Sequence, residues 1–220
     1  YIALGGNVTY REMSHDPICQ NVTGLMNAIA HLGSPSVRAV ATPAGNVGTA
    51  APAADCATML MTLGADVVLV NSKGERTVSL KDFYLGRNRT IKQADEIIRE
   101  IRFPAIRQGE GTGYCKAARR KAQDIGKILA GVRVHLEKNI LTEAAISLGA
   151  LNAKIVRAAS LEEAIKGMEK SEAYQYLKQN FPIEAGLRDS YFKEYKESVT
   201  KAIVAQAFSR AIADAEKERF

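Results

Sequence analysis

The sequence predicts an α+β protein built in two parts. Its 220 residues, 46% of them apolar, can bury one large core or two smaller ones. Segments with strand-like and helix-like patterns occur on both sides of a polar, Gly-rich connection, "AIRQGEGTG", which begins at Ala105. The sequence contains neither internal repeats nor low-complexity tracts. We therefore predict one domain over residues 1–106 and another over residues 110–220.

The first elements of the chain are predicted to be a strand and two helices. Residues 2–9 have a strand pattern, and "TYREMSHDP" predicts a short helix that Pro17 limits. The segment "NVTGLMNAIAHLG" predicts a helix that ends at Gly33. Its apolar residues at helical spacing are Val22, Leu25, Met26, Ile29 and Leu32.

The middle of the chain is predicted to contain a loop, a helix and a hairpin. Residues 41–55, "ATPAGNVGTAAPAAD", carry no bulky side chain except Val47 and are expected to form a loop. "PAADCATMLMTLG" then predicts a helix that ends at Gly64. "ADVVLVNSKGERTVSL" predicts a β-hairpin with a polar turn, and "ADEIIREIRFP" predicts a strand that ends at Pro104. The predicted apolar face of the helix comprises Ala54, Ala57, Met61 and Leu63.

The second part is predicted to end in helices. In "SLEEAIKGMEK", Ser160 and Glu163 have the spacing of a capping box. The last segment predicts a long amphipathic helix that packs on the domain. We interpret "GEGTG", Gly109 to Gly113, as a linker and not as a phosphate loop. The apolar stripe of the last helix comprises Phe192, Tyr195, Val199, Ile203, Phe208 and Ile212.

Charge and cysteine usage narrow the classes of function. The net charge is +6, but the one dense cluster of cations, "KAARRK", has a single aromatic neighbour, Tyr114, so no nucleic-acid partner is expected. Cys19, Cys56 and Cys115 lie far apart without zinc or iron–sulfur spacing, and we interpret them as reduced thiols of a cytoplasmic protein. No membrane span is expected, because no apolar run approaches the roughly 20 residues that one requires.

The segment of small residues is the strongest candidate for a ligand site. Gly45 and Gly48 allow positive φ angles and the close approach of a ligand, and Asn46 can hold the loop through its side-chain amide. Backbone amides presented before a helix suit a pyrophosphate, and the Asp55 carboxylate can accept hydrogen bonds from sugar hydroxyls. A tight loop that lets helix and sheet pack closely is an equally good interpretation, because the sequence has neither a P-loop lysine nor GxGxxG here.

Two motifs occur in order along the chain. The first comprises "GSPSVR" at Gly33, "TPAGN" at Thr42, "PAAD" at Pro52 and "DFY" at Asp82. The second is "YCKAARRKAQDIGKI" at Tyr114, followed by "AGVRVHL" and "LRDSYFKEYKESVTKAIVAQAF". Together they resemble the FAD-binding subunits or domains of the molybdenum hydroxylases, the family of xanthine dehydrogenase and aerobic carbon monoxide dehydrogenase. The resemblance covers nearly the whole chain.

This resemblance implies a fold and a cofactor. The fold is the second part of a PCMH-type FAD-binding domain, followed by a smaller α+β domain of the carbon monoxide dehydrogenase flavoprotein C-terminal type. The resemblance places Asp55 at the ribityl or ribose hydroxyls, and Tyr114 or Lys116 near the isoalloxazine ring, on which an aromatic face can stack. Tyr114 is equally well interpreted as a buried structural side chain. The implied FAD-binding residues are Leu32, Thr42, Pro43, Ala44, Gly45, Asn46, Thr49, Asp55, Ile98, Tyr114 and Lys116.

The chain departs from the family pattern in two respects. Ala44 stands where the family has the first of two glycines, and Pro43 replaces an aliphatic residue and removes a backbone donor, so we expect a weaker or shifted grip on the pyrophosphate. The family's other phosphate loop, a Gly-Gly-rich turn, has no counterpart here, since "LGGN" at Leu4 lies in the predicted first strand. We expect that loop before Tyr1 in the natural protein, or else a protein that does not hold FAD tightly.

The function that the resemblance implies is electron transfer. In this family a large subunit with a molybdenum cofactor oxidises the substrate, and a small subunit passes the electrons through two [2Fe–2S] clusters to FAD, which delivers them to an external acceptor. The chain is then the flavoprotein subunit of an oxidoreductase, in a hetero-oligomer such as a dimer of heterotrimers. It has no catalytic residue for the substrate and no metal site of its own. The alternative is a cofactor-free scaffold that holds the partner subunits together.

Overall fold

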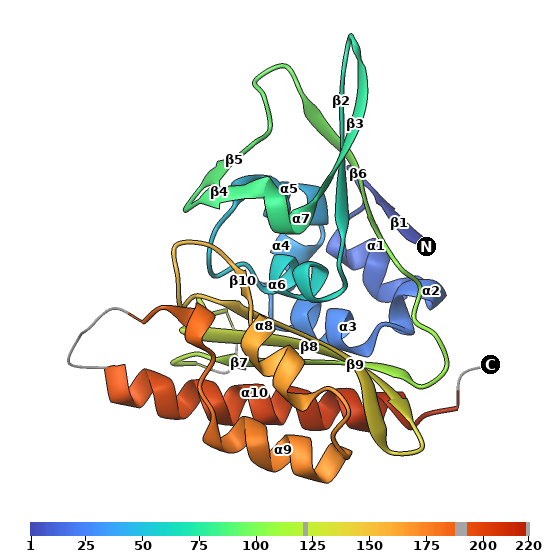
Figure 1. The fold of residues 1–220 in the computed structure, drawn as a ribbon. Coiled ribbons are helices and arrows are strands. Elements are labelled where there is room, and N and C mark those ends of the chain that lie inside the picture. The colour runs from blue at the N-terminus through green and yellow to red at the C-terminus, as the bar shows by residue number, and fades with distance from the viewer. Residues whose placement is uncertain (121–122, 188–192, 219–220) are drawn as a thin grey trace.

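The fold combines three antiparallel sheets with ten α-helices in the residues that the computed structural model describes, which are 1–120, 123–187 and 193–218 (Figure 1). The strands are β1 (Ile2–Gly5), β2 (Asp66–Asn71), β3 (Gly74–Ser79), β4 (Tyr84–Gly86), β5 (Arg89–Thr90), β6 (Ile97–Phe103), β7 (Glu110–Ala117), β8 (Ile128–Glu137), β9 (Ile140–Gly149) and β10 (Val156–Arg157). The helices are α1 (Tyr10–His15), α2 (Pro17–Gln20), α3 (Thr23–Ala30), α4 (Pro35–Arg38), α5 (Pro43–Thr49), α6 (Asp55–Thr62), α7 (Leu80–Phe83), α8 (Ala159–Ile165), α9 (Lys170–Gln179) and α10 (Lys193–Ala215), with a 3₁₀ turn at Ile183–Ala185. The α+β fold class is as predicted.

Each part of the chain has its own four-stranded sheet. The first sheet has the order β1-β6-β2-β3 and the second has the order β10-β9-β8-β7, while β4 and β5 form a small hairpin. In Figure 1 the second sheet lies between α10 on one face and α3 and α6 on the other. The helices of the first part therefore pack on the sheet of the second part. Tyr114 and Leu129, although they lie in the second part, are members of the first hydrophobic core.

The predicted hairpin and the strand before Pro104 are confirmed. Asn71 pairs with Gly74, so the β2–β3 turn has two central residues, and β6 ends at Phe103. The predicted short helix after the first strand is also present, and a capping box of Thr9 and Glu12 begins it. Pro17, which was predicted to limit this helix, is also the first residue of α2, where no intrahelical donor is needed.

The segment of small residues is a helix, so the prediction of a loop was wrong. The hydroxyl oxygen of Thr42 caps α5 by accepting from the Gly45 N–H at 3.0 Å, and Pro43 occupies the first helical position. The helix ends where Ala50 takes up a left-handed backbone with φ 49°. Gly45 and Gly48 lie inside the helix, and neither has the positive φ that we expected.

All eight residues of α6 are buried, although the sequence predicts a single apolar face. Glycines of the second sheet explain this burial. An added Cβ at Gly131 of β8 would lie 2.4 Å from Thr62 Oγ1, and one at Gly149 of β9 would lie 2.7 Å from Thr58 Oγ1. The absence of these side chains lets α6 press against the second sheet while it also packs on the helices of the first part.

Strand β7 begins at Glu110, so the interpretation of "GEGTG" as a linker was wrong for most of its length. Gly111 and Gly113 are strand residues that face α10. An added Cβ would lie 2.0 Å from Ala211 O at the first position and 2.0 Å from Ala207 O at the second. Strand and helix thus approach each other closely because the glycines have no side chains.

Two helix predictions in the second part also need correction. Helix α8 has Ala158 as its N-cap, without a side-chain hydrogen bond, and the Ser160 hydroxyl donates to Glu184 at 2.7 Å. The prediction of a capping box of Ser160 and Glu163 was therefore wrong. The long final helix is present as α10. Of its predicted stripe, Phe208 is buried and Ile203 and Ile212 are partly buried against the core, whereas Tyr195 is 64% exposed. Phe192 lies outside the described residues. The buried residues of α10 are Thr200, Val204, Ala205, Ala207, Phe208, Ala211, Asp214 and Ala215.

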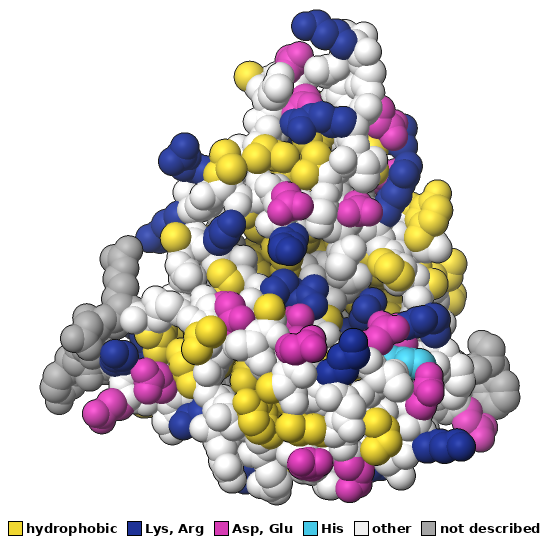
Figure 2. All heavy atoms as spheres, in the orientation of Figure 1, with side chains coloured by type: hydrophobic (Ala, Val, Ile, Leu, Met, Phe, Trp, Pro, Cys, Tyr) yellow, Lys and Arg dark blue, Asp and Glu magenta, His cyan; other side chains and the backbone are white. Residues whose placement is uncertain are grey.

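The surface carries both signs of charge. On the face drawn in Figure 2, Lys and Arg side chains are spread over the molecule with Asp and Glu side chains between them. Among the described residues, none of the helices combines the length and the apolar character needed to cross a membrane.

Candidate functional site

One face of β7 forms the contact with the first part of the chain. Thr112, Tyr114 and Lys116 are two residues apart, so their side chains point to the same side of the strand. Thr112 Oγ1 accepts a hydrogen bond from the Gly24 N–H of α3 at 2.9 Å. The next two residues on this face reach Asp55, the first residue of α6.

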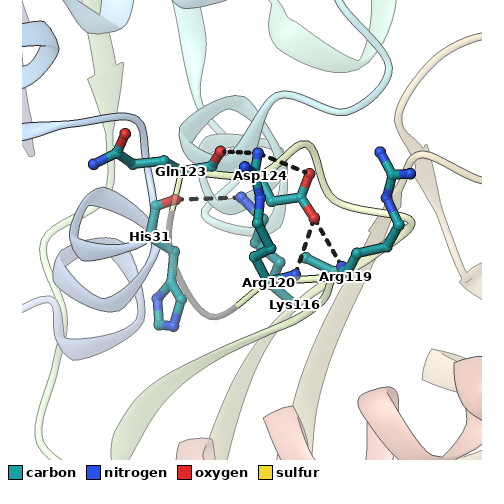
Figure 3. A pocket seen from close by; sticks show the side chains of 7 residues that line it. His31, Lys116, Arg119, Arg120, Gln123 and Asp124 are labelled. Atoms are coloured by element: carbon teal, nitrogen blue, oxygen red, sulfur yellow. Dashed lines mark hydrogen bonds and ion pairs between the residues drawn. The ribbon is translucent and has the colours of Figure 1, made fainter.

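Asp55 receives both of its protein donors on one oxygen. The Tyr114 hydroxyl donates to Oδ1 at 2.6 Å, and Lys116 Nζ lies 2.9 Å from the same atom. Lys116 Nζ also donates to the carbonyl oxygen of His31 at 3.2 Å, where α3 ends (Figure 3). The Lys116 and Asp55 side chains are only 6% and 11% exposed. Oδ2 of Asp55 has no hydrogen-bond partner among the described residues.

Tyr114 is held as a neutral hydrogen-bond donor. Burial raises its pKa well above the usual value, and the neighbouring Asp55 carboxylate raises the pKa further. Its side chain has no exposed surface, and the His31 ring lies tilted beside it with 6.3 Å between ring centroids. No face of Tyr114 is therefore available to stack on a flavin, and that part of our expectation was wrong. The alternative, a buried structural tyrosine, describes its packing.

Helix α5 has a bare exposed face. Gly45 and Thr49 are exposed, and the Thr49 hydroxyl donates to the Gly45 carbonyl at 2.8 Å. An added Cβ at Gly45 would meet only Thr42 Oγ1, at 3.2 Å. The opposite face, with Pro43, Ala44 and Val47, is buried. A diphosphate-sized group can approach this exposed face without meeting a bulky side chain.

The amides of this segment do not form the open row that we expected. Thr42 takes the Gly45 N–H through its hydroxyl and the Asn46 N–H through its carbonyl, at 3.0 Å in both cases. Pro43 has no N–H, so Ala44 keeps the one first-turn amide without a partner among the described residues. Binding of a diphosphate here has to rely more on the proton of the Thr42 hydroxyl and on close approach than on amide donors.

The other candidate residues join this helix to its neighbours. Asn46 Oδ1 accepts from the Ala57 N–H at 3.1 Å, which confirms the expected side-chain tie and fixes α5 against α6. Ile98 of β6 packs beside α5, since an added Cβ at Gly48 would lie 3.5 Å from its Cδ1. The Leu32 carbonyl accepts from Arg38 at 2.9 Å. The candidates thus form two groups, one on α5 and one around Asp55 at the start of α6, and the bond from Ala57 to Asn46 joins the two helices.

A basic pocket opens beside Lys116. It has a volume of about 390 Å³, and its lining also includes His31, Arg119, Arg120 and Asp124 (Figure 3). Asp124 accepts from the backbone N–H groups of Arg119 and Arg120 at 2.8 and 3.1 Å. These bonds outweigh the opposing effect of desolvation and lower the pKa of Asp124. The Arg119 guanidinium points away from this carboxylate in Figure 3.

A larger cavity, which none of the predictions from the sequence includes, lies between the two parts of the chain. It measures about 930 Å³, and Thr49 and Arg87 line it from the first part, with Lys127 and Lys196 from the second. No aspartate or glutamate is among the described residues of its lining. We name this space the interdomain cavity. Its lining comes from segments that are far apart in the sequence, so no local pattern predicts it.

Comparisons with known proteins identify relatives of both parts. Residues 1–106 match the family described as "FAD binding domain in molybdopterin dehydrogenase", and residues 113–211 match "CO dehydrogenase flavoprotein C-terminal domain". The nicotinate dehydrogenase FAD-subunit of Eubacterium barkeri is 30% identical over 181 residues, which are 78% of this chain and 61% of that protein. This chain therefore spans about three fifths of that relative's length.

Further matches extend over almost the whole chain. The xanthine dehydrogenase FAD-binding subunit of Escherichia coli O157:H7 is 23% identical over 96% of this chain and 75% of its own. The fold matches a chain of the carbon monoxide dehydrogenase from Hydrogenophaga pseudoflava that lacks the Mo-pyranopterin moiety. That match has a TM-score of 0.86 and 24% identity, and it covers 96% of this chain and 75% of that one.

Proposed function

Because this chain belongs to the family of FAD-binding subunits of the molybdenum hydroxylases, we propose that it is the electron-transfer flavoprotein of a multi-subunit dehydrogenase. In this proposal the [2Fe–2S] clusters of a small subunit supply the electrons, and a large subunit with the molybdenum cofactor oxidises the substrate. An external acceptor takes the electrons from the flavin. The assembly is a cytoplasmic hetero-oligomer, such as a dimer of heterotrimers. Residues 1–106 form its cofactor domain and residues 110–220 its C-terminal domain.

The bare face of α5 and the nearby carboxylate of Asp55 fit FAD better than they fit a purely structural role. The Thr42 hydroxyl accepts from Gly45 and keeps its own proton to donate, and Gly45 offers an approach without a Cβ, which suits the diphosphate. Asp55 Oδ2 supplies an acceptor for a ribityl or ribose hydroxyl. The observation that carries the proposal is this pairing of a bare helix face with a carboxylate oxygen that has no protein partner among the described residues.

The residues of this chain bind and tune the cofactor, and bound FAD supplies the redox chemistry. Lys116 places a positive charge in a nearly buried position beside the basic pocket. A fixed cation near a flavin stabilises negative charge on its reduced form, which raises the reduction potential. We assign this tuning role to Lys116.

The interdomain cavity is our proposed position for the external acceptor. Thr49 belongs both to the cofactor face of α5 and to the lining of the cavity, so a molecule there would lie beside the proposed FAD site. Among the described residues, the side chains of Arg87, Lys127 and Lys196 form no ion pair with a carboxylate, and they would attract a phosphate- or carboxylate-bearing acceptor. A volume of about 930 Å³ is in the range of small-molecule sites.

The proposal is tested by the flavin content of the purified full-length protein and of a Gly45→Val variant. We expect oxidised-flavin absorbance bands near roughly 375 and 450 nm in the wild type. The valine side chain would occupy the exposed face of α5, so we expect the variant to lose FAD and to keep its circular dichroism spectrum. Gly48→Ala is the control, because its methyl group would meet Ile98 in ordinary van der Waals contact at 3.5 Å.

The same measurement separates the flavoprotein from the alternative, a cofactor-free scaffold. A wild-type complex without flavin absorbance from this subunit would favour the scaffold. Equal flavin content in wild type and Gly45→Val would refute the assignment of the diphosphate to α5.

A further inference from the structure

We infer that Tyr114 and Lys116 of the C-terminal domain are positioning residues for Asp55, so that the C-terminal domain sets the affinity of the N-terminal domain for FAD. This inference rests on the proposed function, because it concerns the carboxylate that we assign to a cofactor hydroxyl. It goes beyond that function in assigning a part of FAD binding to residues that do not themselves need to touch the cofactor.

The first step of the argument is the unequal use of the two Asp55 oxygens. Both donors of β7 converge on Oδ1, with the Tyr114 hydroxyl at 2.6 Å and Lys116 Nζ at 2.9 Å. Each carboxylate oxygen has two lone-pair directions, so Oδ1 is saturated by these two donors. A hydroxyl of the cofactor is therefore directed to Oδ2, which has no partner among the described residues.

The second step is that the two donors are themselves fixed. Tyr114 has no exposed surface, and its backbone carbonyl accepts from Arg210 of α10 at 2.6 Å. Lys116 is held at a second point by the His31 carbonyl at 3.2 Å. A carboxylate held by two immobile donors cannot rotate freely about its last side-chain bond. Its orientation is thus fixed before a ligand arrives, which lowers the entropy cost of binding.

The third step concerns charge. Asp55 is nearly buried, and a buried carboxylate is costly unless an opposite charge compensates it. Lys116 is the one cation paired with it among the described residues. Because Lys116 comes from the C-terminal domain, the charge that compensates Asp55 is supplied across the contact between the two domains.

A separate set of contacts holds β7 against α3 and provides a control. Thr112 Oγ1 accepts from the Gly24 N–H at 2.9 Å, and the Thr112 N–H donates to Asp214 Oδ2 at 2.9 Å. Thr112 lies on the same face of the strand as Tyr114 and makes no hydrogen bond to Asp55. Thr112→Val therefore weakens the same domain contact without removing a donor to Asp55.

The experiment measures the dissociation constant of FAD for the full-length flavoprotein, from the recovery of flavin fluorescence on release. Tyr114→Phe removes one hydroxyl and keeps the ring, and we expect about tenfold weaker binding, the size of one hydrogen bond to a charged group. Lys116→Met should weaken binding at least as much, and Lys116→Arg should recover part of the loss because it restores the charge. Thr112→Val should lower the melting temperature and leave the FAD dissociation constant unchanged.

A double-mutant cycle distinguishes positioning from general destabilisation. In an Asp55→Asn background, we expect Tyr114→Phe to have little further effect on FAD affinity, because the group that it positions has already changed. FAD affinities of Tyr114→Phe and Lys116→Met equal to wild type would overturn the inference, as would an equal loss in Thr112→Val. If Lys116→Met does not fold, Tyr114→Phe and the cycle decide. A wild-type protein without FAD would instead refute the proposed function itself, and the inference with it.

Discussion

Replacing Gly113 with alanine should strongly destabilise the protein, because β7 and α10 pack backbone to backbone at this position. The added Cβ would lie 2.0 Å from Ala207 O and 2.7 Å from Ala211 N, and neither backbone atom can rotate away. Ordinary contact begins at 3.4 Å, so relief of the shorter contact requires a separation of strand and helix by 3.4 minus 2.0, or 1.4 Å. Overpacking of a core costs about 1–3 kcal/mol, and we expect the upper end of this range here.

The assay for this prediction is thermal unfolding followed by circular dichroism. For a protein of this size, about 3 kcal/mol corresponds to a melting temperature lowered by roughly 6–12 °C. Gly86→Ala is the matched control, because no atom lies within 4 Å of its added Cβ and its φ angle is not positive. A Gly113→Ala variant that melts within about a degree of this control would refute the argument from close packing.

Two further outcomes are expected. Hydrogen bonds from Arg76 and from the Gln93 N–H lower the pKa of Glu96 from 4.5 to about 2, so the stabilising contribution of Glu96 is complete above pH 4.5 and is lost as the pH falls toward 2. Glu96→Gln should therefore flatten the decline of the melting temperature between these pH values. An equally steep decline in the variant would contradict the role given to Glu96. Replacing Arg87 and Lys196 with glutamine should raise KM for an anionic electron acceptor severalfold and weaken the dependence of KM on salt. Steady-state kinetics at two ionic strengths would measure both effects. Kinetics identical to wild type at both ionic strengths would exclude the interdomain cavity as the acceptor site.

Elements whose local sequence pattern is compatible with only one type of secondary structure were predictable from the sequence. The β2–β3 hairpin and the strand before Pro104 are examples, because short runs rich in Val and Ile, bounded by a polar turn or by proline, specify them without help from the rest of the chain. The small-residue segment was not predictable in this way. Two glycines indicate a loop, whereas Thr42 and Pro43 at the start indicate a helix, and the packing of Val47 in the core decides between them.

The buried face of α10 shows how a neighbouring strand can override periodicity. A stripe of large residues was expected to pack on the domain. Phe208 does so, but Ile203 and Ile212 are only partly buried, whereas Ala207 and Ala211 are fully buried. Small residues occupy the centre of the contact because the facing strand brings its backbone against the helix. The sequence of a helix alone does not reveal how closely its partner approaches.

The sequence predicted residues of the candidate site but not the contacts between them. The resemblance identified Asp55, Tyr114 and Lys116 as separate cofactor contacts, and it gave no sign that they bind one another. Tyr114 and Asp55 are separated by 59 positions, and their hydrogen bond forms because the second sheet packs on α3 and α6 in the folded chain. The identity of a side chain is read directly from the sequence, but the partner of a buried polar group depends on which elements pack together.

The two faces of β7 link packing to the site. Glycines on one face admit the backbone of α10, and the alternate residues on the other face hold Asp55. Arg210 of α10 donates to the Tyr114 carbonyl at 2.6 Å, so the helix also holds the backbone of the residue that binds Asp55. A displacement of α10 would therefore move the Tyr114 hydroxyl relative to α6. Because of this linkage, a change in the C-terminal helix can alter FAD affinity without any contact between that helix and the cofactor.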